Sequence, residues 1–126
     1  MSQDSNIPIY EIYPTDEFNN NMKYYIKKKK YKSISKDINN ILRDLEKGIF
    51  AGDPIADLKL DTSNKVYKIR AANTDTKQGK SSGYRLIYYV ETEDKIVFLV
   101  TIYYKKDNDR IPTDKEIINL IKEYCI

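Results

Sequence analysis

The chain has 126 residues, a formal net charge of +3 and an apolar share of 40%, which together predict one globular domain with a single core. It contains no histidine and one cysteine, so a His/Cys metal cluster and Ser-His or Cys-His nucleophilic catalysis are excluded. Any chemistry must therefore use Lys, Arg, Tyr, Asp or Glu. We expect no metal and no other cofactor.

The N-terminal stretch "MSQDSNIPIY" has neither the basic nor the apolar region of a secretion signal. No apolar run approaches the ~20 residues that cross a bilayer. We therefore expect a cytoplasmic protein with no membrane contact. Residues 1–6 are expected to form a flexible leader and residues 7–126 a single domain.

The first half of the domain is predicted to contain one strand and two helices. The segment "IPIYEIY" predicts the strand, and "PTDEF" predicts a helix start with Thr15 as N-cap. Apolar residues then recur at helical spacing in two runs, which are separated by a break near Ser33. The second run ends at Gly48, which suits the position after a helix C-terminus. A helical hairpin is expected.

The second half is predicted to contain three strands and a final helix. After a loop, "AGDPIADLKLDTSN", the strand-like runs are "KVYKIRAA", "GYRLIYYVE" and "KIVFLVTIYY". Only "TED" separates the last two, so they should form a hairpin within an antiparallel meander. Thr113 and Glu116 form a capping box for the helix. The order β, α, α, β, β, β, α predicts an α+β fold, a mainly antiparallel twisted sheet packed by a helical hairpin and a C-terminal helix.

The segment "GKSSG" (Gly79–Gly83) looks like part of a phosphate-binding loop. That motif needs an earlier glycine, where this chain has Thr74, and it needs a helix to follow, where this chain has a predicted strand. Nucleotide binding is therefore not expected here. The two glycines can instead allow a close approach of another backbone or of a ligand.

Strand alternation places several cations on one face of the predicted sheet. Lys68 and Arg70 share a face of their strand, and Arg85 has the corresponding phase on the next strand. Tyr103 can join them from the third strand. Like charges this close repel each other, so an anion such as a phosphate backbone would stabilise the cluster. The alternative is a polar outer face of an antiparallel sheet, where such an arginine contributes little to stability.

A basic run, "KKKKYK", lies at the end of the first predicted helix. Its lysines suit the negative end of a helix dipole and can simply be solvated, or they can contact an acidic partner. The sequence leaves both readings open.

The quoted segments together resemble the RelE/ParE superfamily of bacterial toxins from type II toxin–antitoxin pairs, closest to its HigB-like RelE branch. The combination of "YKIR", "GKSSGYR" and "TIY" at these spacings carries the resemblance, which extends over residues 7 to 124. It implies a RelE-like fold and a ribosome-dependent endoribonuclease, an mRNA interferase that inhibits translation. The implied partners are the ribosome, mRNA and a cognate antitoxin protein.

The resemblance also implies a catalytic set. Lys68 and Arg70 match the basic residues of the family's "Y-K-I-K" strand, and Arg85 matches the arginine of its "S-G-Y-R". Tyr103 matches an aromatic acid/base residue near the end of the last strand, and Lys106 a basic residue just after it. The histidines of HigB-like relatives are missing. The expected contacts to RNA or the ribosome are made by Lys27, Lys28, Lys29, Lys30, Lys32 and Lys80.

The implied reaction transfers an RNA phosphodiester to its own 2′-hydroxyl without a metal ion. Lys68 is expected to act as the base, Arg85 to hold the phosphate with help from Arg70, and Tyr103 to stack on a base or relay a proton. Two other readings stay open. One is a ParE-like gyrase inhibitor, and the other is a catalytically inactive relative that binds RNA or its antitoxin.

Overall fold

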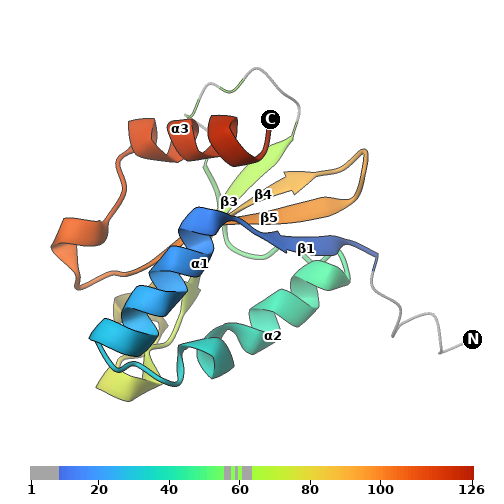
Figure 1. Cartoon of the computed structure of the whole chain (residues 1–126). Coiled ribbons are helices and arrows are strands. Elements are labelled where there is room, and N and C mark those ends of the chain that lie inside the picture. The colour runs from blue at the N-terminus through green and yellow to red at the C-terminus, as the bar shows by residue number, and fades with distance from the viewer. Residues whose placement is uncertain (1–8, 56–57, 59, 61–63) are drawn as a thin grey trace, which may run out of the picture.

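The computed structural model describes residues 9–55, 58, 60 and 64–126. Within them, a twisted five-stranded mixed sheet packs against three α-helices, an α+β architecture (Figure 1). The elements are β1 (Glu11–Pro14), α1 (Asp16–Lys23), α2 (Ile34–Glu46), β2 (Asp53–Pro54), β3 (Lys65–Ala71), β4 (Tyr84–Glu91), β5 (Ile96–Tyr104) and α3 (Asp114–Tyr124). The predicted leader, residues 1–6, lies outside the described residues.

The helices begin where the sequence predicts, and α2 ends just before Gly48, as predicted. The Thr15 hydroxyl accepts a hydrogen bond from the Phe18 N–H at 3.2 Å and caps α1, which continues as a π-helical turn over Tyr24–Lys28. Helix α2 starts after Ser33, and Gly48, two residues beyond its end, has φ +80°. The capping box of α3 is formed, with Thr113 and Glu116 bonding each other's backbone N–H groups. The three predicted helices are therefore confirmed.

The predicted meander and the first predicted strand are confirmed, whereas the pairing of the two outer strands was not predicted. The sheet order is β1-β5-β4-β3-β2, in which β3, β4 and β5 pair antiparallel. Strand β1 pairs parallel with β5, so the sheet is mixed. Strand β2 lies in the segment predicted as a loop and pairs antiparallel with β3. Both pairings join segments without a tight turn between them, so no local turn signal announces them.

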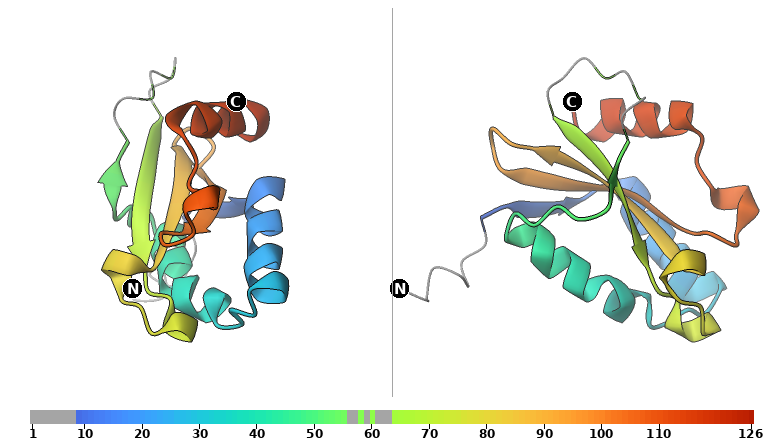
Figure 2. Two further views of the ribbon diagram at one scale, coloured as in Figure 1. Left: turned by 90° about the vertical axis from the view of Figure 1, so that its left-hand side faces the viewer. Right: turned by 180° about the vertical axis from the view of Figure 1, so that it is seen from behind.

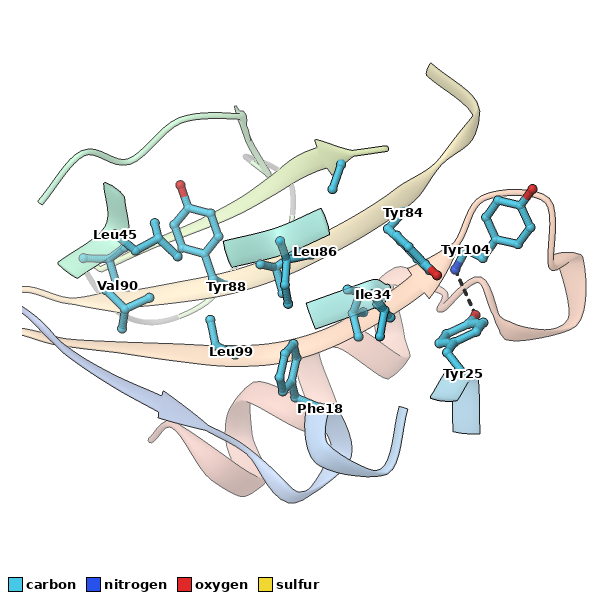
Figure 3. Close-up of a cluster of buried hydrophobic side chains, with 14 residues drawn as sticks. Phe18, Tyr25, Ile34, Leu45, Tyr84, Leu86, Tyr88, Val90, Leu99 and Tyr104 are labelled. Carbon is cyan, nitrogen blue, oxygen red and sulfur yellow. Dashed lines mark hydrogen bonds between the residues drawn. The ribbon is translucent and has the colours of Figure 1, made fainter. Parts of the chain in front are cut away.

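The sheet separates two apolar clusters, and its strands alternate between them. On one face, the larger cluster is covered by α1 and α2 and receives Tyr84, Leu86, Tyr88 and Val90 from β4 (Figure 3). On the other face, Ile87 and Tyr89 of β4 pack with residues of α3. Figure 2 shows α2 and α3 on opposite sides of the sheet. Helix α3 covers only part of its face, and the candidate site occupies the rest.

Among the described residues, no helix has both the length and the apolar character needed to cross a membrane.

Candidate functional site

A cavity of about 390 Å³ opens on the α3 side of the sheet, at the end where β4 begins and β5 finishes. Its lining consists of Asp53, Lys68, Arg70, Arg85, Tyr103, Lys105 and Ile111. Strand register explains why these residues meet, because Arg70 of β3 lies opposite Arg85 of β4, which in turn lies opposite Tyr103 of β5. We call this site the cation cavity. The prediction that Lys68, Arg70 and Arg85 share one face of the sheet, joined by Tyr103, is confirmed.

Arg85 is the most enclosed cation of the cavity, with 6% of its surface exposed. Its Nη1 donates hydrogen bonds to the Lys80 and Tyr84 carbonyl oxygens at 3.0 and 3.2 Å, and its Nη2 donates one to the Ser81 carbonyl oxygen at 2.9 Å. These bonds use three of the five N–H groups of the guanidinium. The Nε–H and one Nη2–H remain, and together they form the edge that can hold two oxygens of a phosphate.

Burial lowers the pKa of Arg85, and the neighbouring charge of Arg70 adds to that shift, while Tyr103 opposes it. An arginine pKa is ordinarily so high that the guanidinium stays charged at neutral pH despite such a shift. The cavity therefore holds a buried, permanent cation beside a second arginine. An anion bound between them would relieve their repulsion.

The premise of the expectation that Arg85 contributes little to stability is wrong. It assumed a solvated polar face, whereas this guanidinium is buried and ties the strand to the preceding loop. Alanine at this position would leave the carbonyl oxygens of Lys80 and Ser81 without their donor. A loss of function in Arg85→Ala could then reflect a displaced loop. Lys68 and Arg70 are cleaner probes of the cavity.

Tyr103 contributes a buried phenol, with 6% of its surface exposed. Burial raises its pKa, and the positive charge of Arg85 acts in the opposite direction. The group is therefore protonated at neutral pH and can donate a hydrogen bond or a proton.

The structure brings Lys105, rather than Lys106, to the cation cavity. Lys105 lines it, and its Nζ donates a hydrogen bond to the Ser81 carbonyl oxygen at 3.1 Å. Lys106 is exposed and is not part of the lining. Strand β5 ends at Tyr104, so strand phase does not determine which of the two lysines turns inward.

The remaining predicted RNA contacts lie outside the cation cavity. Lys80 lines a neighbouring groove of about 720 Å³ between α2 and β3, which shares Asp53, Lys68 and Arg70 with the cavity. The lysines of the basic run are exposed at the turn between α1 and α2. They are Lys27, Lys28, Lys29, Lys30 and Lys32.

Asp53 is the site residue that sequence reasoning missed. It lies on β2 directly opposite Lys68, and it brings a carboxylate into the cation cavity. Gly52 makes this approach possible, because its φ is +104° and a Cβ there would stand 2.6 Å from the Lys68 carbonyl oxygen. A two-residue strand within a Gly, Asp and Pro-rich segment reads as a loop. The only local signal is the glycine itself.

The "GKSSG" segment is a loop that leads into β4, as predicted, and it contains a short 3₁₀ turn, Lys80–Ser82. A Cβ on Gly83 would lie 2.1 Å from the Ala71 carbonyl oxygen, whereas a Cβ on Gly79 would meet no atom within 4 Å. Gly83 is thus required by backbone packing against the end of β3. We predicted that these glycines allow another backbone or a ligand to come close. At Gly83, the backbone that comes close is that of the chain's own residue Ala71.

Among the described residues, no group of three or more His, Cys, Asp or Glu side chains is arranged to hold a metal ion. No family model matches the sequence, and no curated protein matches it at a significant level.

Proposed function

We propose that the chain is an endoribonuclease that cuts RNA by transferring a phosphodiester to the neighbouring 2′-hydroxyl. The observation that carries this proposal is the cation cavity. Two adjacent strands, β3 and β4, and the residue after β5 bring Lys68, Arg70, Arg85 and Lys105 to one space, where a buried phenol and a carboxylate join them. Cations stabilise the charge of a pentacoordinate phosphate, and the other groups supply proton transfer.

In this reaction the 2′-oxygen forms a bond to phosphorus and the bond to the 5′-oxygen breaks. Arg70 and the free edge of Arg85 hold the non-bridging oxygens. Lys68, in its neutral amine form, takes the proton of the 2′-hydroxyl and becomes a cation, and Tyr103 gives a proton to the departing 5′-oxygen. The products are a 2′,3′-cyclic phosphate and a 5′-hydroxyl. No step requires a metal ion.

The biological setting rests on the resemblance to RelE-type toxins, and the geometry of the cavity is compatible with it. In that setting the protein is the toxin of a type II toxin–antitoxin pair. Its substrate is mRNA on the ribosome, its site of action is the cytoplasm, and its activity is suppressed by an antitoxin. A small acidic antitoxin that covers the cation cavity would neutralise its charge and block the entry of RNA.

We expect induced expression of the chain in bacteria to stop growth and to create new 5′ ends within ribosome-bound mRNA. A Lys68→Ala/Arg70→Ala variant at equal abundance should do neither. The measurement is mapping of mRNA 5′ ends on isolated ribosomes. Growth arrest without new RNA ends, accompanied by loss of supercoiling activity of purified gyrase, would replace this proposal with gyrase inhibition. An absence of both effects would leave an inactive binding protein.

A further inference from the structure

Asp53 is a carboxylate in a cavity that is otherwise lined by cations, a phenol and one aliphatic side chain. The steps of the proposed reaction use two arginines, a lysine and the phenol, and none of them uses Asp53. Its negative charge repels a phosphate, so a bound phosphate and the Asp53 carboxylate occupy different parts of the cavity. Asp53 therefore faces another part of a bound RNA.

Strand register separates Asp53 from the position of the phosphate. Arg70 and Arg85 lie opposite each other on β3 and β4, and the proposed phosphate lies at this pair. Asp53 lies one strand farther out, on β2, opposite Lys68, which is two residues before Arg70 on β3. Two residues along a strand span about 7 Å, and neighbouring strands are about 4.8 Å apart. A nucleotide whose phosphate contacts the two arginines can therefore extend its base toward Asp53.

The cation cavity continues past Asp53 into the groove of about 720 Å³ between α2 and β3. Asp53, Lys68 and Arg70 line both spaces. Strand β2 begins at Asp53, so among the described residues no strand pairs on this side with the part of β3 that follows Lys68. The apolar part of the groove consists of Ile41, Ala51, Ile69, Ala71 and Ala72. Such a surface can cover the flat faces of a base, and Asp53 lies where the polar edge of that base can reach it.

The backbone holds Asp53 in place, and its carboxylate has no partner within the protein. Gly52 before it has φ +104° and packs against the backbone of β3, and Pro54 after it restricts Asp53 to an extended conformation. No hydrogen bond or ion pair joins the Asp53 carboxylate to any other residue that the structure describes. Asp37, which also lines the groove, is by contrast bonded to the N–H and hydroxyl of Thr74 at 3.0 and 2.9 Å. Asp53 is thus a fixed acceptor that is open to a ligand.

An ionised carboxylate only accepts hydrogen bonds, and this property determines which bases it can bind. Cytosine, adenine and guanine each present an amino group, whereas uracil presents carbonyl oxygens that a carboxylate repels. In single-stranded RNA these edges are free for recognition by a protein. The groove should therefore favour bases that carry an amino group and disfavour uracil.

We propose that the groove between α2 and β3 is a subsite for the base of a nucleotide next to the cut, and that Asp53 selects a base that carries an amino group. This inference rests on the proposed function, because the choice of RNA as the ligand comes from it. It extends that function by assigning a base preference to one residue. Asp53 is then a specificity-determining residue, which contacts the base and not the reacting phosphate.

The test compares a cytidine oligonucleotide with a uridine oligonucleotide of equal length, both carrying 2′-O-methyl groups. The methyl group blocks the nucleophile, so binding is measured without cleavage, and a homopolymer presents the same base in every register. Fluorescence anisotropy gives both affinities at one low salt concentration, since phosphate contacts weaken as salt rises. The variant is Asp53→Asn, which keeps the size of the side chain and introduces donor N–H groups. The matched control is Asp94→Asn, which makes the same change of charge at an exposed position in the β4–β5 turn.

We expect the wild type to bind the cytidine oligonucleotide at least about tenfold more tightly than the uridine oligonucleotide, as one hydrogen bond to a charged group predicts. Asp53→Asn should abolish this preference, and Asp94→Asn should keep it. Both variants lose one negative charge, so any general gain in affinity for RNA is common to them and cancels in the ratio. Denaturant unfolding should give similar midpoints for all three proteins, because both carboxylates are exposed.

The inference is overturned if the wild type binds both oligonucleotides equally or binds neither, if Asp53→Asn keeps the preference, or if Asp94→Asn also loses it. Cleavage of the same sequences with free 2′-hydroxyl groups separates this inference from the proposed function. A cytidine preference in binding without any cleavage would contradict the proposed function alone. Cleavage of both RNAs without a preference that depends on Asp53 would contradict this inference alone. An equal loss of cleavage of both RNAs in Asp53→Asn would also overturn it, because Asp53 would then act in the reaction itself.

Discussion

Replacing Lys68 and Arg70 together with alanine should lower RNA cleavage by about 10³-fold or more and leave the fold intact. Loss of one preorganised donor to a charged transition state typically costs ~10²–10³ in rate, and this variant removes two cations of the cation cavity. Arg70 is exposed and Lys68 half-buried, so the free energy of unfolding should change little. Single-turnover cleavage and denaturant unfolding of the same preparations measure both effects.

Lys65→Ala is the matched control for that variant. Lys65 is an exposed lysine on the same strand. Strand alternation places it on the face opposite to Lys68 and Arg70, and it is absent from the cavity lining. Its removal should leave cleavage unchanged. The single variants Lys68→Ala and Arg70→Ala should each lose less than the double variant, and additive effects would show that the two residues act independently. Cleavage at the wild-type rate by the double variant would remove both residues from the mechanism.

Gly83→Ala should destabilise the protein by more than about 3 kcal/mol, a loss that only severe steric or packing defects produce. The added Cβ would stand 2.1 Å from the Ala71 carbonyl oxygen and 2.9 Å from the Asn73 nitrogen, both of them backbone atoms of the neighbouring strand end. Neither can move without opening the β3–β4 ladder. The loop that Arg85 holds would be displaced with it.

Gly79→Ala tests the same change in the same loop, at a position where the new methyl group meets no atom within 4 Å. Its free energy of unfolding should stay within ~0.5 kcal/mol of the wild type. Denaturant midpoints of the two variants, measured side by side, show whether only Gly83→Ala loses stability. Similar stability of Gly83→Ala and Gly79→Ala would contradict the backbone contact described for Gly83.

Local chemistry explains how much of the fold the sequence predicts. The caps at Thr15 and Thr113 and the short β4–β5 turn act over a few residues, and each lies where its pattern indicates. The neighbours of the outer strands depend on long-range packing. The parallel pairing of β1 with β5 joins the two halves of the chain, and β2 is too short to show alternation.

In the candidate site too, local patterns are predictable from the sequence and long-range contacts are not. Alternation within regular strands correctly brings Lys68, Arg70 and Arg85 to one face. It does not reveal that Arg85 is buried, because the carbonyl oxygens that hold it belong to an irregular loop. Nor does it reveal Asp53, which reaches the cavity through the tight turn at Gly52.

The measurement that tests the proposed reaction most directly is cleavage of an RNA in which the nucleotide before the cut carries 2′-deoxyribose. If the 2′-hydroxyl is the nucleophile, this single change should abolish cutting there, and the unmodified RNA should yield a 2′,3′-cyclic or 3′-phosphate and a 5′-hydroxyl. The proposed chemistry draws on the lysine, arginine and tyrosine side chains that line the cation cavity. Continued cleavage of the 2′-deoxy substrate, or products with 5′-phosphates, would contradict the mechanism assigned to Lys68, Arg70 and Arg85.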